Sequence, residues 1–393
     1  MNEMRQHWQL NPEIEFLNHG SFGACPKCVL DVQNEYRAQL ERDPIQFLAP
    51  ERELEPKLDT VRESVAELIQ APPSDIAFVR NATDGVNAVV RSMEFKEGDE
   101  IVCTNHGYNA CNNAAEFAVS RAGGRLRVAN VPFPIKSPAE VLQAIDDALS
   151  PRARLLLVDH VTSPTGVVFP VAEIISLAHS KQVPVMVDGA HAPGMIPLNV
   201  RELGVDYYTA NHHKWLCAPK VSGFLYVAAE HQESVRPTVI SHAANRARPN
   251  RSKFISEFDW NGTYDVTPLL AVPHAIEFLA KLVPGGPEGL MASNRQKTLR
   301  ARELLCEALS CEVPAPDEMI GSLATIPLPP AARRRFESAD ALQARLYEQH
   351  RIELPIFDYG HSAVRMLRVS MQAYNGLDQI ERLCDALRDE LSL

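Results

Sequence analysis

The chain has 393 residues, of which 45% are apolar and 23% are charged, and its formal net charge is −11. This length allows a large core and predicts two domains, while the acidic balance argues against nucleic acid as the main partner. No stretch approaches the roughly 20 apolar residues of a membrane span, and the first residues lack the apolar core of a signal peptide. We therefore expect a cytoplasmic protein without a membrane partner, and we expect its eight cysteines to be reduced.

A polar arm and a turn-forming run open the chain. Residues 1–16 are largely polar, and residues 18–23, with the sequence Asn-His-Gly-Ser-Phe-Gly, have little room for a core role. Cys25 and Cys28 form a lone CxxC, which is a weak signal for zinc or redox chemistry because no second pair accompanies it. We therefore expect no metal site, and we place the end of the arm at residue 25.

Strands and helices alternate over residues 26–267, which predicts a large α/β domain. Helical patterns, interrupted by prolines in the first of them, cover 26–70, 138–149 and 171–181. Short strands are expected at 75–80, 99–104, 125–128, 155–158 and 183–187. This alternation builds a mostly parallel mixed sheet flanked by helices, and ligands gather at the carboxyl ends of the strands of such a sheet.

Polar residues follow several of these strands directly. Ala82 and Thr83 lie in an Asn-Ala-Thr-Asp run that can cap a helix, and a helix N-terminus offers free N–H groups to a phosphate. Capping alone would also explain this run. His106 and Tyr108 follow the next strand, and Ser163 lies in the Asp159–Gly166 segment after a later one.

The most informative stretch pairs a strand-end carboxylate with a lysine. A buried apolar run ends at Asp188, with His191 three residues later, and a second β-prone run leads through Asn211 and His213 to Lys214. This combination suits pyridoxal phosphate (PLP), because a carboxylate pairs with the pyridinium nitrogen and a lysine holds the aldehyde as a Schiff base. Crowding by apolar and cationic neighbours makes such a lysine easier to deprotonate.

The pattern changes after residue 267. Helices are expected at 268–282, 288–310 and 338–350, with a strand near 320–328 and a strand-and-loop segment at 353–369. These elements predict a smaller α+β domain over residues 268–393, preceded by a basic, loop-like segment at 241–260. Arg368 in the last strand can fix a carboxylate in bidentate fashion, or it can form a structural ion pair.

The segments 188–191 and 211–215 resemble the cofactor motifs of the class V aminotransferase family, whose members are fold type I PLP enzymes. Residues 17–23 and 367–375 resemble the two ends of its isopenicillin N epimerase-like branch, so the resemblance covers nearly the whole chain. It implies the PLP transferase fold type I, a PLP cofactor, an amino-acid substrate, and a homodimer with active sites at the subunit interface.

The resemblance also implies roles for single residues. Those expected to contact the cofactor are Ala82, Thr83, His106, Tyr108, Ser163, Asp188, His191, Asn211, His213, Lys214 and, in the neighbouring subunit, Thr263. Those expected to contact the substrate are Asn18, His19 and Arg368, with Ser21 beside them. Each of these roles has a purely structural alternative. Residues 18–21 and 163–166 can form plain turns, and residue 263 can lie in a solvated loop. His191 can be a core histidine, and Tyr108 can be a buried tyrosine bonded to the backbone.

The fate of the substrate is left open by the sequence. Epimerisation at Cα needs a second acid besides Lys214, for which Tyr108 and His361 are candidates. Loss of a β-sulfur group, as in the ergothioneine-type C–S lyases of the same branch, and transamination are the alternatives. A cysteine desulfurase is disfavoured because no cysteine lies between 354 and 367, and a serine hydrolase because no Gly-x-Ser-x-Gly motif is present.

Overall fold

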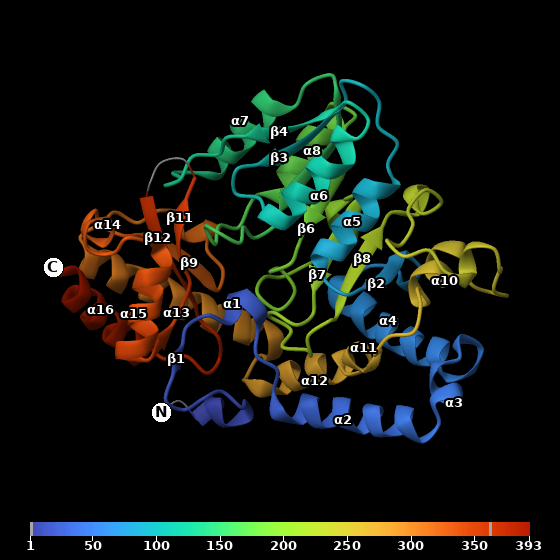
Figure 1. Ribbon diagram of the computed structural model, residues 1–393, viewed down its shortest axis with the longest axis horizontal. Helices are drawn as coiled ribbons and strands as arrows, with labels where there is room; N and C mark the ends of the chain where they lie inside the picture. The colour runs from blue at the N-terminus through green and yellow to red at the C-terminus, as the bar shows by residue number, and fades with distance from the viewer. Residues whose placement is uncertain (1–2, 361–363) are drawn as a thin grey trace.

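The computed structural model describes residues 3–360 and 364–393. A large α/β part, built on a seven-stranded sheet, lies beside a smaller α+β part built on a three-stranded sheet (Figure 1). The expected fold class is therefore confirmed. The boundaries proposed at residues 25 and 267 stay predictions.

The central sheet has the order β2-β8-β7-β6-β5-β3-β4. Its strands are β2 (Ile76–Val79), β3 (Glu100–Thr104), β4 (Arg125–Ala129), β5 (Ala153–Asp159), β6 (Val185–Asp188), β7 (Tyr207–Asn211) and β8 (Gly223–Val227). Only β8 runs antiparallel to its neighbours in this sheet. Helices cover both faces, which is why most of the strands are continuous apolar runs rather than alternating ones.

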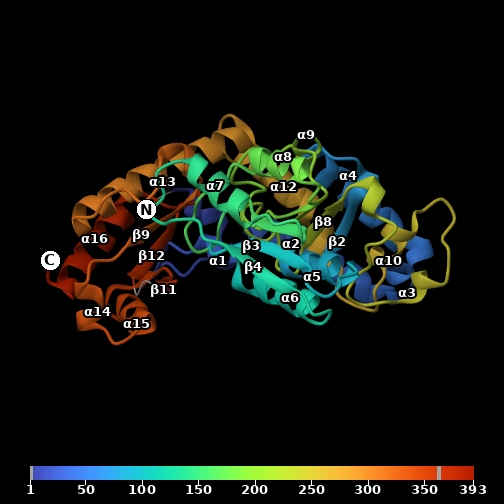
Figure 2. The same cartoon turned by 90° about the horizontal axis from the view of Figure 1, so that it is seen from above.

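Two sets of helices form these covers (Figure 2). One face packs on α5 (Ala82–Ser92), α6 (Asn109–Ser120) and α10 (Lys253–Asp259). The other packs on α4 (Glu55–Ile69), α7 (Pro138–Ala148), α8 (Val171–Ser180) and α9 (Val200–Leu203). Gly85 lets α5 lie directly on β7, because a Cβ at this position would come within 2.2 Å of the Thr209 hydroxyl.

The helical stretch after the arm is divided where prolines were expected to interrupt it. It consists of α2 (Lys27–Arg42), α3 (Pro44–Leu48), a π-helical turn η2 (Pro50–Leu54) and α4. Pro44, Pro50 and Pro56 each lie in the first turn of a segment, where the missing N–H has no intrahelical role.

The helices α11 (Thr267–Leu270) and α12 (Val272–Leu282) follow in the chain and add their buried residues to the core of the large part. The smaller part contains the long α13 (Gly286–Leu309). Its sheet has the order β11-β12-β9, with β9 (Leu323–Pro327), β11 (Ile356–Tyr359) and β12 (Val364–Ser370). The helices α14 (Ala331–Arg335), α15 (Ala339–His350) and α16 (Leu377–Leu391) pack around it. None of the described helices could cross a membrane alone, and one pair bent by 70°, Thr267–Leu282 with Gly286–Leu309, could do so on length and composition.

The N-terminal arm, which the sequence predicts to be polar, is anchored to the rest of the chain. The short strand β1 (Glu15–Phe16) pairs in parallel with β10 (Ile352–Glu353). Trp8 is only 3% exposed, packs against Phe278 and Tyr374, and donates its indole N–H to a main-chain carbonyl. A single large apolar side chain thus fixes a segment whose average composition is polar.

The expectation of a basic loop at 241–260 is wrong for its second half, which forms α10. Ser252 caps the helix, and Phe254, Ile255 and Phe258 are buried. The spacing of these three apolar residues is helical and was hidden by the surrounding arginines. Arg251 binds Asp59 and Asp259, so the basic side chains neutralise acidic ones on neighbouring helices.

Val221 combines exposure with a strained backbone. Its φ of 67° lies in the left-handed region, and its side chain is 51% exposed. Backbone strain at a β-branched residue in this region destabilises the folded state by about 1–3 kcal/mol. Glycine has no such strain, and its only disadvantage is the larger conformational entropy that it loses on folding. Val221→Gly should therefore raise the free energy of unfolding by about 1 kcal/mol in denaturant titrations. Val313→Gly, at an exposed site without positive φ, should lower it, and a loss of stability in both variants would contradict the strain.

Candidate active site

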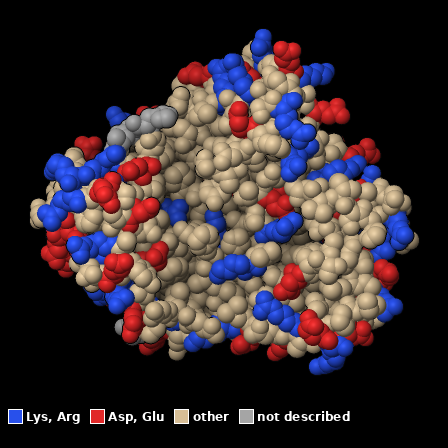
Figure 3. All heavy atoms as spheres, viewed as in Figure 1, with Lys and Arg blue, Asp and Glu red and all other residues tan. Residues whose placement is uncertain are grey.

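The predicted site residues converge at the carboxyl ends of β5, β6 and β7. Asp159 and Asp188 end β5 and β6, and Asn211 ends β7 with Lys214 shortly after it. The surface is hollowed between the large and small parts, and Lys and Arg side chains lie within this hollow (Figure 3). These candidates lie together at the strand ends, and their roles in a site stay predictions.

Lys214 is half-buried, and its Nζ lies 3.0 Å from Nε2 of His191. Burial lowers the pKa of Lys214 to about 8, Asp188 opposes this shift, and Arg368 adds to it. A larger fraction of neutral amine is consequently present near neutral pH than in an ordinary lysine, as attack on an aldehyde requires.

The ring of His191 is fixed from its other side. Trp215, which is fully buried, directs its indole N–H at Nδ1 of His191 over 3.3 Å. An indole nitrogen can only donate, so Nδ1 accepts and Nε2 carries the proton. The Nε2–H then points at Lys214 Nζ, which favours the neutral amine, and burial lowers the pKa of His191 well below its usual value.

Asp188 is a buried carboxylate with specific donors. It accepts the thiol proton of Cys111 at 3.1 Å and the N–H of Ala190 at 3.0 Å. Burial raises the pKa of Asp188, and these two hydrogen bonds and Lys214 counteract that shift. Cys111, in the first turn of α6, was not identified from the sequence, because a single cysteine in a helix gives no signal of its own.

The start of α5 supplies the other end of the site. Asn81 caps the helix, because its Oδ1 accepts the main-chain N–H of Asp84. The Ala82 N–H donates to Asn211 Oδ1 at 2.9 Å. His213, which is half-buried, has an Nδ1 without a hydrogen-bond partner among the described residues. Burial, followed by Lys214, lowers the pKa of His213 to about 4. The positive end of α5 and the Nδ1 of His213, which has no partner among the described residues, suit a phosphate group.

Arg368 reaches across from the small part. Its Nη1 donates to the carbonyl oxygen and the hydroxyl of Ser163 at 2.5 and 3.3 Å, and its Nη2 donates to the Ser21 hydroxyl at 3.1 Å. Its Nε has no partner among the described residues, and burial lowers the pKa of Arg368 to about 10. Asn18 accepts the Ser21 hydroxyl proton at 2.5 Å and donates to Glu353 at 2.9 Å.

The two candidate rings near the cofactor position differ in their surroundings. His106 is fully buried, with Nδ1 bonded to the Thr165 hydroxyl at 2.7 Å and Nε2 to the Val131 carbonyl at 3.2 Å. Tyr108 is 45% exposed and lies directly before α6. The geometry favours Tyr108 as the ring that meets a ligand.

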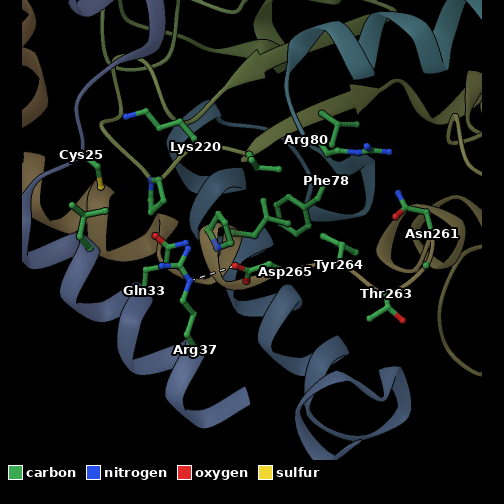
Figure 4. A pocket seen from close by; sticks show the side chains of 17 residues that line it. Cys25, Gln33, Arg37, Phe78, Arg80, Lys220, Asn261, Thr263, Tyr264 and Asp265 are labelled. Carbon is green, nitrogen blue, oxygen red and sulfur yellow. Dashed lines mark hydrogen bonds and ion pairs between the residues drawn. The ribbon is translucent and has the colours of Figure 1, made fainter. Parts of the chain in front are cut away.

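His19 and Thr263 lie differently from the other candidates. His19 is fully buried, with its ring nitrogens 2.7 Å from the Tyr374 hydroxyl and 2.9 Å from the Lys214 carbonyl oxygen, so it supports the backbone of the lysine. Thr263 lines a separate cavity of about 650 Å³ with Arg80 and Lys220 (Figure 4). The predicted substrate contact of His19 and phosphate contact of Thr263 stay predictions, and His361 lies outside the described residues.

These residues fit PLP. A buried carboxylate with two donors is suited to the ring nitrogen, and Lys214 to the aldehyde. The helix start with Ala82 and Thr83, together with the unpartnered nitrogen of His213, is suited to the phosphate. When bound, the cofactor would supply an electron sink for the substrate carbon that bears the amino group.

The lowered pKa of Lys214 predicts how cofactor capture depends on pH. Only the neutral amine attacks the aldehyde, so the rate at which the apoprotein takes up PLP should rise with pH through about 8 rather than 10.5. The absorbance of the lysine-bound cofactor measures this rate. Lys214→Ala should give no cofactor that borohydride fixes to the protein. Fixation of PLP to another lysine, or a rate that rises only above pH 10, would contradict the assignment.

Comparison with known proteins agrees with this geometry. The model of the aminotransferase class V family matches residues 20–383. Isopenicillin N epimerase of Streptomyces clavuligerus is 34% identical over 397 residues, covering 98% of this chain and 97% of that protein. The probable chloroplastic L-cysteine desulfhydrase of Arabidopsis thaliana is 31% identical, covering 96% and 83%.

The fold has solved counterparts. A complex of the cystine C–S lyase C-DES with cysteine persulfide superimposes with a TM-score of 0.80 at 21% identity, covering 96% of this chain and 98% of that one. The architecture is therefore that of the fold type I PLP enzymes, as the sequence predicted. The chain belongs to the class V aminotransferase family and is a PLP-dependent enzyme.

Proposed function

We propose that the protein is an amino-acid epimerase that acts at Cα of its substrate, with PLP, which Lys214 would hold, supplying the electron sink. The placement of two proton-transfer groups carries this proposal. Lys214 follows β7 and Tyr108 follows β3, and the strands that end in Asp188 and Asp159 lie between them. Inversion at a carbon requires a proton acceptor on one side and a donor on the other.

Arg368 binds and orients the substrate. A guanidinium matches the two oxygens of a carboxylate. The Nε of Arg368 has no partner in the described part of the chain, so it can still donate a hydrogen bond to a ligand. Ser163 and Ser21 hold two corners of the guanidinium, so the carboxylate is received in one orientation. Such positioning contributes several kcal/mol to barrier reduction in enzymes generally.

Lys214 and Tyr108 move the proton. The neutral Lys214 amine, backed by His191, takes the proton from Cα, and the Tyr108 hydroxyl delivers one to the other face. Asp188, held by Cys111 and Ala190, would pair with the ring nitrogen of bound PLP and so favour its protonated form. Support comes from the likeness to two isopenicillin N epimerases, each 34% identical to this chain.

A β-elimination that breaks a C–S bond is the second candidate. Tyr108 also favours it, because an exposed phenol at this position can protonate a leaving sulfur atom. Several relatives are described as L-cysteine desulfhydrases, and one of Schizosaccharomyces pombe, 26% identical, as a hercynylcysteine sulfoxide lyase. Transamination is a third outcome of the same site.

We also propose that the protein works as a homodimer in the cytoplasm. Thr263 is exposed, and the cavity it lines has no Lys214 among its described lining residues. A contact between Thr263 and the phosphate therefore requires a second copy. Phe22 and Ile240, which are 75% and 60% exposed, give apolar surface for such an interface.

Turnover of amino acids in D₂O should distinguish the reactions. Epimerisation gives product that carries deuterium at Cα and is of inverted configuration, because the second face is protonated from solvent-exchanged Tyr108. Chiral chromatography with mass spectrometry detects it. Release of pyruvate would select the C–S lyase instead, and a keto acid in stoichiometric amount would select transamination. Tyr108→Phe should abolish inversion while α-deuteration with retention, through Lys214, persists.

Loss of the Arg368 guanidinium should weaken substrate binding selectively. Arg368→Ala should raise KM for amino acids by about 100-fold, since a charge-assisted bidentate contact is lost, with a much smaller effect on PLP affinity. Steady-state kinetics and PLP titration of the apoprotein measure the two. Arg345→Ala, at a half-exposed arginine of α15, is the control and should change neither. An equal loss of PLP and substrate binding would place Arg368 in the cofactor site instead.

A further inference from the structure

A polar residue lies beside Arg368 in the sheet of the small part. Thr325 on β9 is the direct partner of Arg368 in the antiparallel pairing of β9 with β12, and it is only 1% exposed. Their neighbours within the two strands belong to the apolar core of the small part: Ala324, Ile326, Leu367 and Val369. Successive side chains of a strand point to opposite faces, so Thr325 and Arg368 share the face that is turned away from this core. The proposed mechanism uses Arg368 and leaves Thr325 without a role.

Thr325 and Arg368 bind the same turn of the large part, which follows β5. Nη1 of Arg368 donates to the carbonyl oxygen and the hydroxyl of Ser163. The Thr325 hydroxyl donates to the carbonyl oxygen of the next residue, Pro164, at 2.7 Å. Two partnered residues of the small sheet thus hold two consecutive carbonyl groups at the tip of one turn. Thr325 therefore fixes the tip independently of the guanidinium.

The turn is compact and packs closely on β9. The main-chain N–H of Thr162 donates to the Val167 carbonyl at 2.9 Å and closes the turn. Gly166 has a φ of 68°, and a Cβ at this position would come within 3.0 Å of the Cβ of Leu323 on β9. Both the positive φ and the close approach favour glycine. A hydrogen bond from β9 to the tip of such a turn also fixes the neighbouring Ser163.

The position of Ser163 decides which edge of the Arg368 guanidinium is left for a ligand. Ser163 occupies Nη1, while Nη2 donates to the Ser21 hydroxyl and Nε has no partner in the described part of the chain. The edge formed by Nε and Nη2 can present two parallel N–H groups to the two oxygens of a carboxylate. A shift of Ser163 would rotate the guanidinium and turn this edge away.

We propose that Thr325 is a positioning residue that holds the Ser163–Pro164 tip and thereby turns the Nε edge of Arg368 toward the carboxylate of the amino acid. This inference rests on the proposed function, because it concerns the recognition of an amino-acid carboxylate by Arg368. Epimerisation, β-elimination and transamination share this recognition step. Thr325 does not contact the substrate itself.

The test measures binding of 2-aminoisobutyrate, an amino acid without an α-hydrogen, through its effect on the absorbance of the PLP-loaded protein. Thr325→Val keeps the shape of the side chain and removes the hydroxyl. It should raise the dissociation constant about three- to tenfold, because Pro164 loses its donor and Ser163 its support. Thr325→Ser keeps the hydroxyl and should stay within about twofold of the unmodified protein. The affinity of the apoprotein for PLP should change less than about twofold in both variants.

A second measurement needs no ligand. Hydrogen exchange of the main-chain N–H groups in residues 160–168, followed by mass spectrometry, should become about threefold faster in Thr325→Val and remain unchanged in Thr325→Ser. Thr104→Val is the matched control for both measurements. Thr104 ends β3, is fully buried, and its hydroxyl has no hydrogen-bond partner among the described residues. Its replacement should change neither the 2-aminoisobutyrate affinity nor the exchange of residues 160–168.

The remaining outcomes separate the failure of this inference from that of the proposed function. Unchanged 2-aminoisobutyrate affinity in Thr325→Val would overturn the positioning role, and so would an equal loss in Thr325→Ser, because packing rather than the hydroxyl would then be responsible. If Thr325→Val does not fold, a loss of affinity in Thr325→Ser would likewise overturn it. If the unmodified, PLP-loaded protein responds to no amino acid, the proposed function fails and the role of Thr325 in carboxylate binding fails with it.

Discussion

The site depends on the placement of a single proton between His191 and Lys214. The indole of Trp215 can only donate, and it occupies Nδ1 of His191, so the proton of the ring must reside on Nε2 and face the lysine. An amine that receives a hydrogen bond in this way is held in its neutral, nucleophilic form. The buried Trp215 therefore prepares the reactivity of Lys214 without touching the substrate.

Much of the fold and of the site was predictable from sequence because strand ends carry the chemistry of a parallel sheet. Asp188, Lys214 and Thr83 each follow a buried apolar run at a short interval, and these intervals alone bring them to one edge. Arg368 also lies where it was expected, on the last strand of the small part. Local patterns and one topological rule were sufficient for these residues.

The rest depended on tertiary contacts that no local pattern contains. His106 and Tyr108 are two residues apart, and only the packing of His106 between Thr165 and Val131 separates their roles. The helix α10 was hidden because the arginines before it suggested a solvated loop, although one of them, Arg251, pairs with Asp59 of α4 and Asp259 of α10. The roles of Trp8 and Cys111 depend on contacts with residues more than ten positions away in sequence, so no local pattern predicts them.

The imidazole of His19 has a consequence for the order in which the enzyme is made. It joins the Tyr374 hydroxyl, close to the last helix, to the main-chain carbonyl of Lys214. A nascent chain that has not yet left the ribosome with residue 374 lacks one of the two groups that hold this ring. The carbonyl of Lys214 is therefore held through a fully supported ring only after residue 374 has been synthesised and has folded against His19.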